Sequence, residues 1–143
     1  MQRNRISNII LAALLTVLPI IFLCSCKDRA MDEYYANRDN YISASGTVDF
    51  LNYDENFTTL YIGFSDLSPA FDDTCFKITG DNLKIVRENG IDEKLTIGTN
   101  VTFVSAPKYY GDGYVFPIVA LRLGGDELLN ADVGFENYVS ERK

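Results

Sequence analysis

The chain of 143 residues contains no histidine, and it has only three cysteines and four prolines. The missing histidine removes the most common general base, the usual partner of a nucleophilic serine or cysteine, and the most frequent zinc ligand. The sequence also lacks a glycine-rich phosphate loop, a Cys-x-x-Cys pair and a Gly-x-Ser-x-Gly elbow. These absences favour a binding protein over an enzyme, and neither a cofactor nor a metal ion is expected.

Basic residues are few and scattered. The 13 lysines and arginines stand against 20 acidic residues, which gives a net charge of −7. Without Arg3 and Arg5, which belong to the N-terminal segment described next, 11 basic residues face 20 acidic ones and the net charge is −9. Because no run of Lys and Arg provides a local basic patch, a nucleic acid would be repelled and is not expected as a partner.

Long apolar runs are also missing. The longest, Ile9–Leu23, has 15 residues and includes Thr16 and Pro19, whereas a membrane-spanning helix needs roughly 20. Arg3 and Arg5 precede it, as in the positive region of an export signal. The sequence therefore predicts a cleaved signal, with an uncleaved N-terminal anchor as the alternative. In both cases the rest of the chain lies outside the cytoplasmic membrane.

The stretch Leu23-Cys24-Ser25-Cys26 at the end of this run resembles the lipobox of bacterial lipoprotein precursors. The resemblance implies that the chain is cut between Ser25 and Cys26 and that Cys26 carries diacylglycerol and an acyl chain such as palmitate. Cys24 occupies the loosest position of the motif. The expected organisation is then a signal peptide (1–25), a lipidated tether with a short helix (26–44) and one folded domain (45–143), held at the cell membrane and facing outward.

The chain from Cys26 onward has 118 residues, the size of one small domain with a tether. Cys75 is the only thiol that remains after lipidation, so no internal disulfide is expected. Its surroundings read as a strand, which indicates a buried structural thiol.

Hydrophobic periodicity predicts a mainly β domain. A short helix is expected over Asp32–Tyr41, a second over Asp81–Glu88 with Asp81 as its cap, and a third from Ala131, interrupted or bent near Gly134. For the second, a strand over Leu83–Arg87 stays open as the alternative. The expected strands are Ser45–Tyr53, Thr58–Ser65, Cys75–Thr79, Val101–Ala106, Val115–Leu123 and Glu127–Asn130.

This order of elements resembles the OB-fold, a small five-stranded Greek-key barrel. The phrases Gly46-Thr47-Val48 and Leu95-Thr96-Ile97-Gly98-Thr99-Asn100-Val101 carry the resemblance. It implies a five- to six-stranded OB-like barrel with a short helix between strands three and four. A β-sandwich and an α+β sheet covered by a helix stay open as alternatives. The predicted core is Val48, Phe50, Leu60, Ile62, Phe64, Phe76, Ile78, Val101, Phe103, Val119 and Leu121.

Two kinds of side chain are candidates for a site. The adjacent carboxylates Asp54-Glu55 and Asp72-Asp73 could help to hold a hard cation, but a solvated acidic turn is the simpler interpretation. A denser cluster of aromatic residues lies between the fourth and fifth strands, where an OB-fold borders its ligand face: Tyr109, Tyr110, Tyr114 and Phe116. These rings could bind a ligand or cover one end of the barrel.

Two function classes remain. The first is a non-enzymatic binding module on the cell surface that holds an envelope protein, a peptide or a glycan, with membrane lipid bound through Cys26. The second is a small hydrolase that acts on an envelope polymer with Asp and Glu residues. The absence of histidine and the small size favour the binding module.

Overall fold

A computed structural model of the chain describes residues 29–67, 70–71, 75–107 and 115–143. The chain divides into two compact units, Met1–Tyr34 and Tyr35–Lys143. The described part of the first unit, residues 29–34, is helical, and Arg29 Nε donates a hydrogen bond of 2.9 Å to Glu33 one turn later. None of the helices in the described ranges has the length and apolar character needed to cross a membrane.

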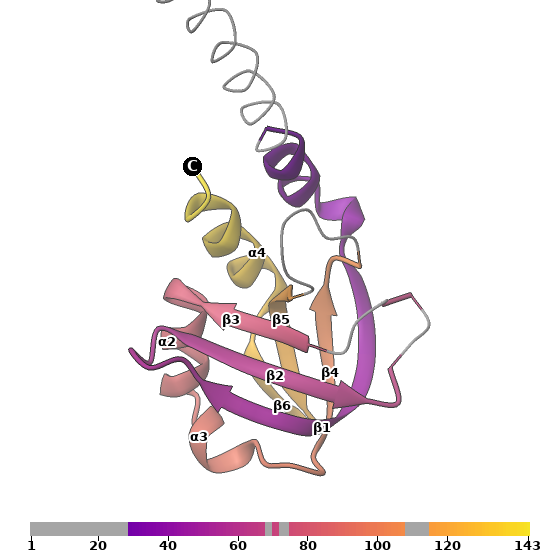
Figure 1. The fold of residues 1–143 in the computed structure, drawn as a ribbon, viewed down its shortest axis with the longest axis vertical. Coiled ribbons are helices and arrows are strands. Elements are labelled where there is room, and N and C mark those ends of the chain that lie inside the picture. Colours follow the sequence, from indigo (N-terminus) through magenta and orange to yellow (C-terminus); the bar gives the residue numbers. More distant parts are fainter. Residues whose placement is uncertain (1–28, 68–69, 72–74, 108–114) are drawn as a thin grey trace, which may run out of the picture. The chain divides into compact units, whose positions relative to one another are not determined.

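The second unit is mainly β (Figure 1). Its sheet has six strands in the order β3-β2-β1-β4-β5-β6, and neighbours in this order are antiparallel. A short parallel pairing of β3 with β5 closes the hydrogen bonds of five strands into a ring. The strands are β1 Ile42–Tyr53, β2 Thr59–Ser65, β3 Cys75–Thr79, β4 Asn100–Ser105, β5 Phe116–Leu123 and β6 Asp126–Leu129. Each expected strand is therefore confirmed, with ends shifted by a few residues at most.

Helix α2, Gly80–Glu88, follows β3 directly and buries Leu83 and Val86, as its spacing predicts. The prediction that Asp81 caps this helix is wrong. The N-cap is Thr79, which makes no side-chain cap bond, and the N–H of Asp81 donates instead to Glu141 Oε1 at 2.7 Å. After Gly90, in the left-handed region at φ 80°, a short helix α3 that the sequence did not indicate spans Ile91–Lys94.

The expected helix over Asp32–Tyr41 is only partly formed. Helical backbone ends at residue 36, and a 3-10 turn, η1, spans Arg38–Asn40. The break occurs at Asn37, whose side chain accepts a hydrogen bond from the N–H of Asp39 and so caps a new turn. Docking through tyrosines is confirmed, because Tyr35 and Tyr41 meet aromatic rings of the C-terminal helix edge-on, at centroid distances of 5.7 and 5.2 Å.

Strand β1 contains a bulge that changes which residues face the core. Val48 pairs with Phe64, but Phe50 pairs with Gly63, so Asp49 is an extra residue. The alternation therefore shifts, and Phe50 is 48% exposed although it was predicted to be buried. The ring of Phe50 fits because Gly63 opposite has no side chain: a Cβ there would lie 2.7 Å from the Phe50 Cβ.

The other ten predicted core residues are buried. Phenylalanines dominate the centre, where Phe64 stacks on Phe103 with ring centroids 4.6 Å apart and Phe76 meets Phe103 at 4.8 Å. Strand β5 is buried along both of its faces from Phe116 to Leu121. One face belongs to this core, and helix α4, Ala131–Ser140, packs on β5 as well.

Helix α4 runs through Gly134 without the interruption that was one of the two expectations there, the other being a bend. The glycine serves close packing instead. A Cβ at Gly134 would lie far inside contact distance of the Val119 carbonyl oxygen on β5, and the Gly134 carbonyl accepts a hydrogen bond of 2.7 Å from buried Asn82. Asn130 caps the helix through its side chain, which accepts from the N–H groups of Asp132 and Val133.

Replacing Gly134 with Ala tests this packing. Alanine favours an isolated helix over glycine by about 1 kcal/mol, but here the added methyl group must push α4 away from β5. We expect the variant to lose about 1–3 kcal/mol of stability, measured by denaturant unfolding. Gly125→Ala is the matched control, because no atom lies within 4 Å of the added Cβ there. An increase in the stability of Gly134→Ala would contradict the close approach.

Candidate binding site at the β1–β2 hairpin

Asp54 organises the turn that joins β1 to β2. Its Oδ1 accepts the N–H groups of Thr58 and Thr59 at 2.6 and 2.8 Å, and its Oδ2 accepts the Thr58 hydroxyl at 2.7 Å. The hydroxyl bond of Thr58 and the N–H bond of Thr59 hold the pKa of Asp54 below its usual value. The carboxylate is therefore ionised at neutral pH and is occupied in fixing the turn.

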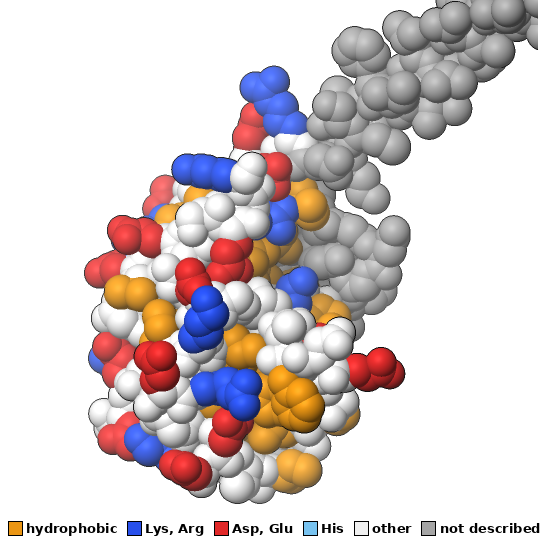
Figure 2. Space-filling model, turned by 90° about the vertical axis from the view of Figure 1, so that its left-hand side faces the viewer, with side chains coloured by type: hydrophobic (Ala, Val, Ile, Leu, Met, Phe, Trp, Pro, Cys, Tyr) orange, Lys and Arg blue, Asp and Glu red, His pale blue; other side chains and the backbone are white. Residues whose placement is uncertain are grey.

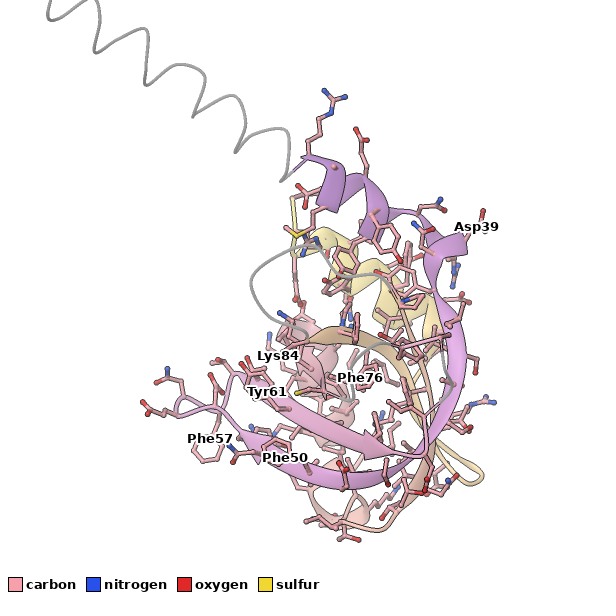
Figure 3. All side chains as sticks on the ribbon, turned by 45° about the vertical axis from the view of Figure 1, so that its right-hand side comes forward. Asp39, Phe50, Phe57, Tyr61, Phe76 and Lys84 are labelled. Carbon is pink, nitrogen blue, oxygen red and sulfur yellow. The ribbon has the colours of Figure 1, made fainter. Side chains whose placement is uncertain are left out.

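Phe57 projects from this turn into solvent (Figure 3). Its φ of 56° lies in the left-handed region, which a bulky side chain rarely adopts, and its side chain is exposed, with 60% of the residue accessible. The N–H of Phe57 donates to the Asp54 carbonyl at 3.1 Å, so the turn imposes this backbone conformation. An exposed aromatic ring on a strained backbone is characteristic of a functional position.

Tyr53, the last residue of β1, forms the base beneath Phe57. Their ring centroids are 5.6 Å apart and the rings are tilted by 38°. The Tyr53 hydroxyl donates to Asp92 Oδ1, and the Arg87 guanidinium lies over the Tyr53 ring, 5.4 Å from its centroid. Arg87 Nε also donates to Asp92 Oδ2 at 3.3 Å. Side chains from β1, α2 and α3 thus hold one tyrosine ring in place.

Burial is the main cause that raises the pKa of Tyr53 to about 12, and the hydrogen bond to Asp92 adds to it. The folded state therefore prefers the neutral phenol. Stability that depends on this phenol is complete below the usual pKa of 10.0 and declines as the pH rises toward 12.

Two hollows flank the Phe57 ring. The first, of about 420 Å³, is lined by Leu51, Asn52, Tyr53, Asp54, Glu55 and Phe57. The second, of about 230 Å³, is lined by Phe57, Thr58, Gly80, Leu83, Lys84 and Arg87. Figure 2 shows a face of the unit on which apolar surface lies among both acidic and basic side chains. The hairpin therefore offers apolar contact area with charged groups on either side.

A third hollow, of about 320 Å³, lies where β4, β5 and β6 meet the start of α4. Its charged groups are already paired: Arg122 with Glu127 at 2.7 Å, and Asp132 with Arg38. Asn130, also in its wall, caps α4 and donates to Glu127 at 3.1 Å. The polar groups of this hollow serve the fold, which makes the hairpin the better candidate.

Most of the site residues expected from the sequence lie outside the described residues: Ser25, Cys26, Tyr109, Tyr110 and Tyr114. Phe116 is described and buried, with its ring 5.5 Å from Phe76 and 5.7 Å from Phe71. Asp72 and Asp73 also lie outside. Within the described ranges, no three Cys, Asp or Glu side chains are grouped to hold a metal ion.

The hairpin was not anticipated as a site. The sequence predicts a turn over the polar stretch Asn52–Asn56, which does not include Phe57. One signal was available: Phe57 directly precedes the expected strand Thr58–Ser65 and is out of phase with the core positions Leu60, Ile62 and Phe64, which indicates a ring outside the core.

Substituting Tyr53→Phe tests the tyrosine network. We expect a loss of about 1 kcal/mol near neutral pH, because one hydrogen bond to Asp92 disappears. The stability difference from the parent should shrink between pH 10 and 12, because the phenol of the unfolded parent ionises there while that of the folded parent stays neutral. Unfolding curves across this pH range measure both effects. A difference that stays constant through the range would show that the folded protein does not raise the pKa of this phenol.

Comparison with known proteins adds no candidate residue to those at the hairpin. At the β1–β2 hairpin, the fold places aromatic side chains next to charged ones in the lining of two hollows. No protein-family model, no curated protein and no solved structure matches this chain.

Proposed function

We propose that this chain is a membrane-anchored extracytoplasmic lipoprotein whose folded unit is a non-enzymatic binding module. The observation that carries the binding role is the exposed Phe57 ring, held in the left-handed region above Tyr53. The left-handed backbone at Phe57 is unfavourable in free energy, and the exposed ring is unfavourable in water. A ring that is kept exposed under these conditions is suited to contact with a partner.

The lipobox resemblance of Leu23-Cys24-Ser25-Cys26 supports the anchor. The two acyl chains of the diacylglyceryl group on Cys26 would supply the double signal that stable membrane attachment needs. The net charge of −9 from Cys26 onward suits a unit that is held near an anionic membrane surface without lying on it. Membrane lipid is then the first partner, and an envelope protein, a peptide or a glycan is the second.

We further propose that the unit is an OB-like barrel. Its support is the closed ring of five strands, the parallel β3–β5 pair and the position of α2 between β3 and β4. In this fold the loop between strands one and two and the loop between strands four and five border the ligand face. Those loops are the Asp54–Thr58 turn and the segment that holds Tyr109, Tyr110 and Tyr114.

At the hairpin, the geometry favours binding over hydrolysis. A glycosidase needs two carboxyl groups that face one substrate. Asp54 is fully engaged with Thr58 and Thr59, and Asp92 holds Tyr53 and Arg87. These carboxylates organise the protein itself, and Glu55 alone is left beside the larger hollow.

Lipid attachment is tested by substituting Cys26→Ser in cells fed a labelled fatty acid. We expect the variant to lose the label and to accumulate as an unprocessed precursor or leave the membrane, because serine provides no thiol for the lipid. Cys24→Ser is the matched control and should be labelled and processed like the parent. The opposite pattern, with the label lost only in Cys24→Ser, would place the lipid on the other cysteine.

The tyrosine segment is tested with Tyr109→Ser combined with Tyr110→Ser. If these rings bind a partner, melting should change little, and capture of envelope components should fall, with hot spots worth on the order of 2 kcal/mol or more. Comparing thermal melting of parent and variant decides the matter before a partner is known. A loss of roughly 3 kcal/mol per ring would instead identify them as packed core residues.

A further inference from the structure

We infer that the larger hollow beside Phe57 receives an arginine or lysine side chain from a segment of a partner protein. The inference rests on the proposed binding role and names the chemistry of the partner. The lining of the hollow includes two aromatic residues, Tyr53 and Phe57, and two acidic ones, Asp54 and Glu55. An aromatic face next to a carboxylate is the combination that attracts an organic cation.

The charges around the hollow favour a cation. Asp54 is ionised, since its hydrogen bonds lower its pKa. Glu55 is exposed, and it takes part in none of the ion pairs among the described residues. No lysine or arginine lines this hollow. The net charge of the whole chain, −7, would also draw a basic partner from a distance.

The other hollow is less suited to any charged ligand. Lys84 is paired with Asp81 at 2.6 Å, and Glu141 and Glu88 also act on it. Arg87 is held by Asp92 and by the Tyr53 ring. Both cations of the smaller hollow are thus paired with nearby carboxylates, so a charged ligand of either sign would gain little electrostatic attraction there.

One ring of this aromatic pair, Tyr53, already holds a guanidinium within the protein. Arg87 lies over the Tyr53 ring with its Cζ 5.4 Å from the centroid, within the usual range for a cation–π contact. Phe57 is the second ring of the pair and remains largely exposed. A guanidinium or ammonium group from a partner could make at Phe57 the cation–π contact that Arg87 makes at Tyr53. Glu55 lines the same hollow and would add an opposite charge.

The backbone at position 57 supports a retained function. Glycine would adopt φ 56° without a steric penalty, whereas phenylalanine is strained there. The ring makes no contribution to the buried core that would offset this cost, since 60% of the residue is exposed. Contact with a partner would account for keeping phenylalanine at this position.

The test uses the full chain, labelled with ¹⁵N and held in neutral detergent. The probe is a capped peptide, Gly-Leu-Arg-Leu-Gly, and its comparison peptide carries citrulline, which keeps the shape of arginine without the charge. We expect the arginine peptide to shift the amide signals of residues 51–57 and to bind at least about fivefold more tightly than the citrulline peptide. Glu55→Gln should weaken binding of the arginine peptide, and added salt should do the same.

Phe57→Gly is the decisive variant, because it removes the ring and suits the left-handed backbone; the relief of strain offsets the greater freedom of the unfolded chain, so the melting temperature should change little. It should weaken binding of the arginine peptide at least about fivefold. Ile97→Ser is the matched control, since it removes another exposed apolar side chain, from the loop before β4, and should not affect binding.

The inference would be overturned by equal binding of both peptides, by shifts away from residues 51–57, or by unchanged binding by Phe57→Gly. Shifts at residues 51–57 with a neutral oligosaccharide, such as maltotetraose, and not with the arginine peptide would also overturn it. That last result would leave the proposed binding role intact, so the two failures are distinguishable.

Discussion

The bulge at Asp49 in β1 is the constraint on which the hairpin depends. Before it, β1 alternates so that Val48 faces the core. After it, the alternation is shifted by one residue, which turns Phe50 outward and brings Leu51 and Tyr53 to pack against the core. One extra residue thus determines that Tyr53 packs against the core and that Phe50 faces the solvent.

The same strand joins the two halves of the sheet. Its first half, from Ile42 to Thr47, pairs with β4, and its second half pairs with β2. At the point of transfer, Gly46 lets the strand approach Phe64, because a Cβ there would lie 2.9 Å from the Phe64 Cβ. The turn that follows Tyr53 is therefore carried by a strand whose first half is held by β4 and whose second half is held by β2, which is a firm support for an exposed turn.

The sequence predicts what local patterns encode. Alternation and glycine breaks were enough for all six strands, for α2, and for most of the core. Prediction from the sequence failed where contacts between residues far apart in the chain determine the local structure. Phe50 is exposed because of a register that Gly63 permits, and Asp81 is not a cap because Glu141, 60 residues later, accepts its N–H. The hairpin site was missed for the same reason, since Arg87 and Asp92 reach Tyr53 only in the fold.

The central claim is that the turn presents Phe57 to a basic partner. A photoreactive phenylalanine analogue placed at position 57 of the full chain, in cells, measures this directly. The account predicts an adduct with another protein that the arginine peptide suppresses and the citrulline peptide does not, and no such adduct from the same analogue at Ile97. Adducts that form equally at both positions, or that the arginine peptide leaves unchanged, would contradict it.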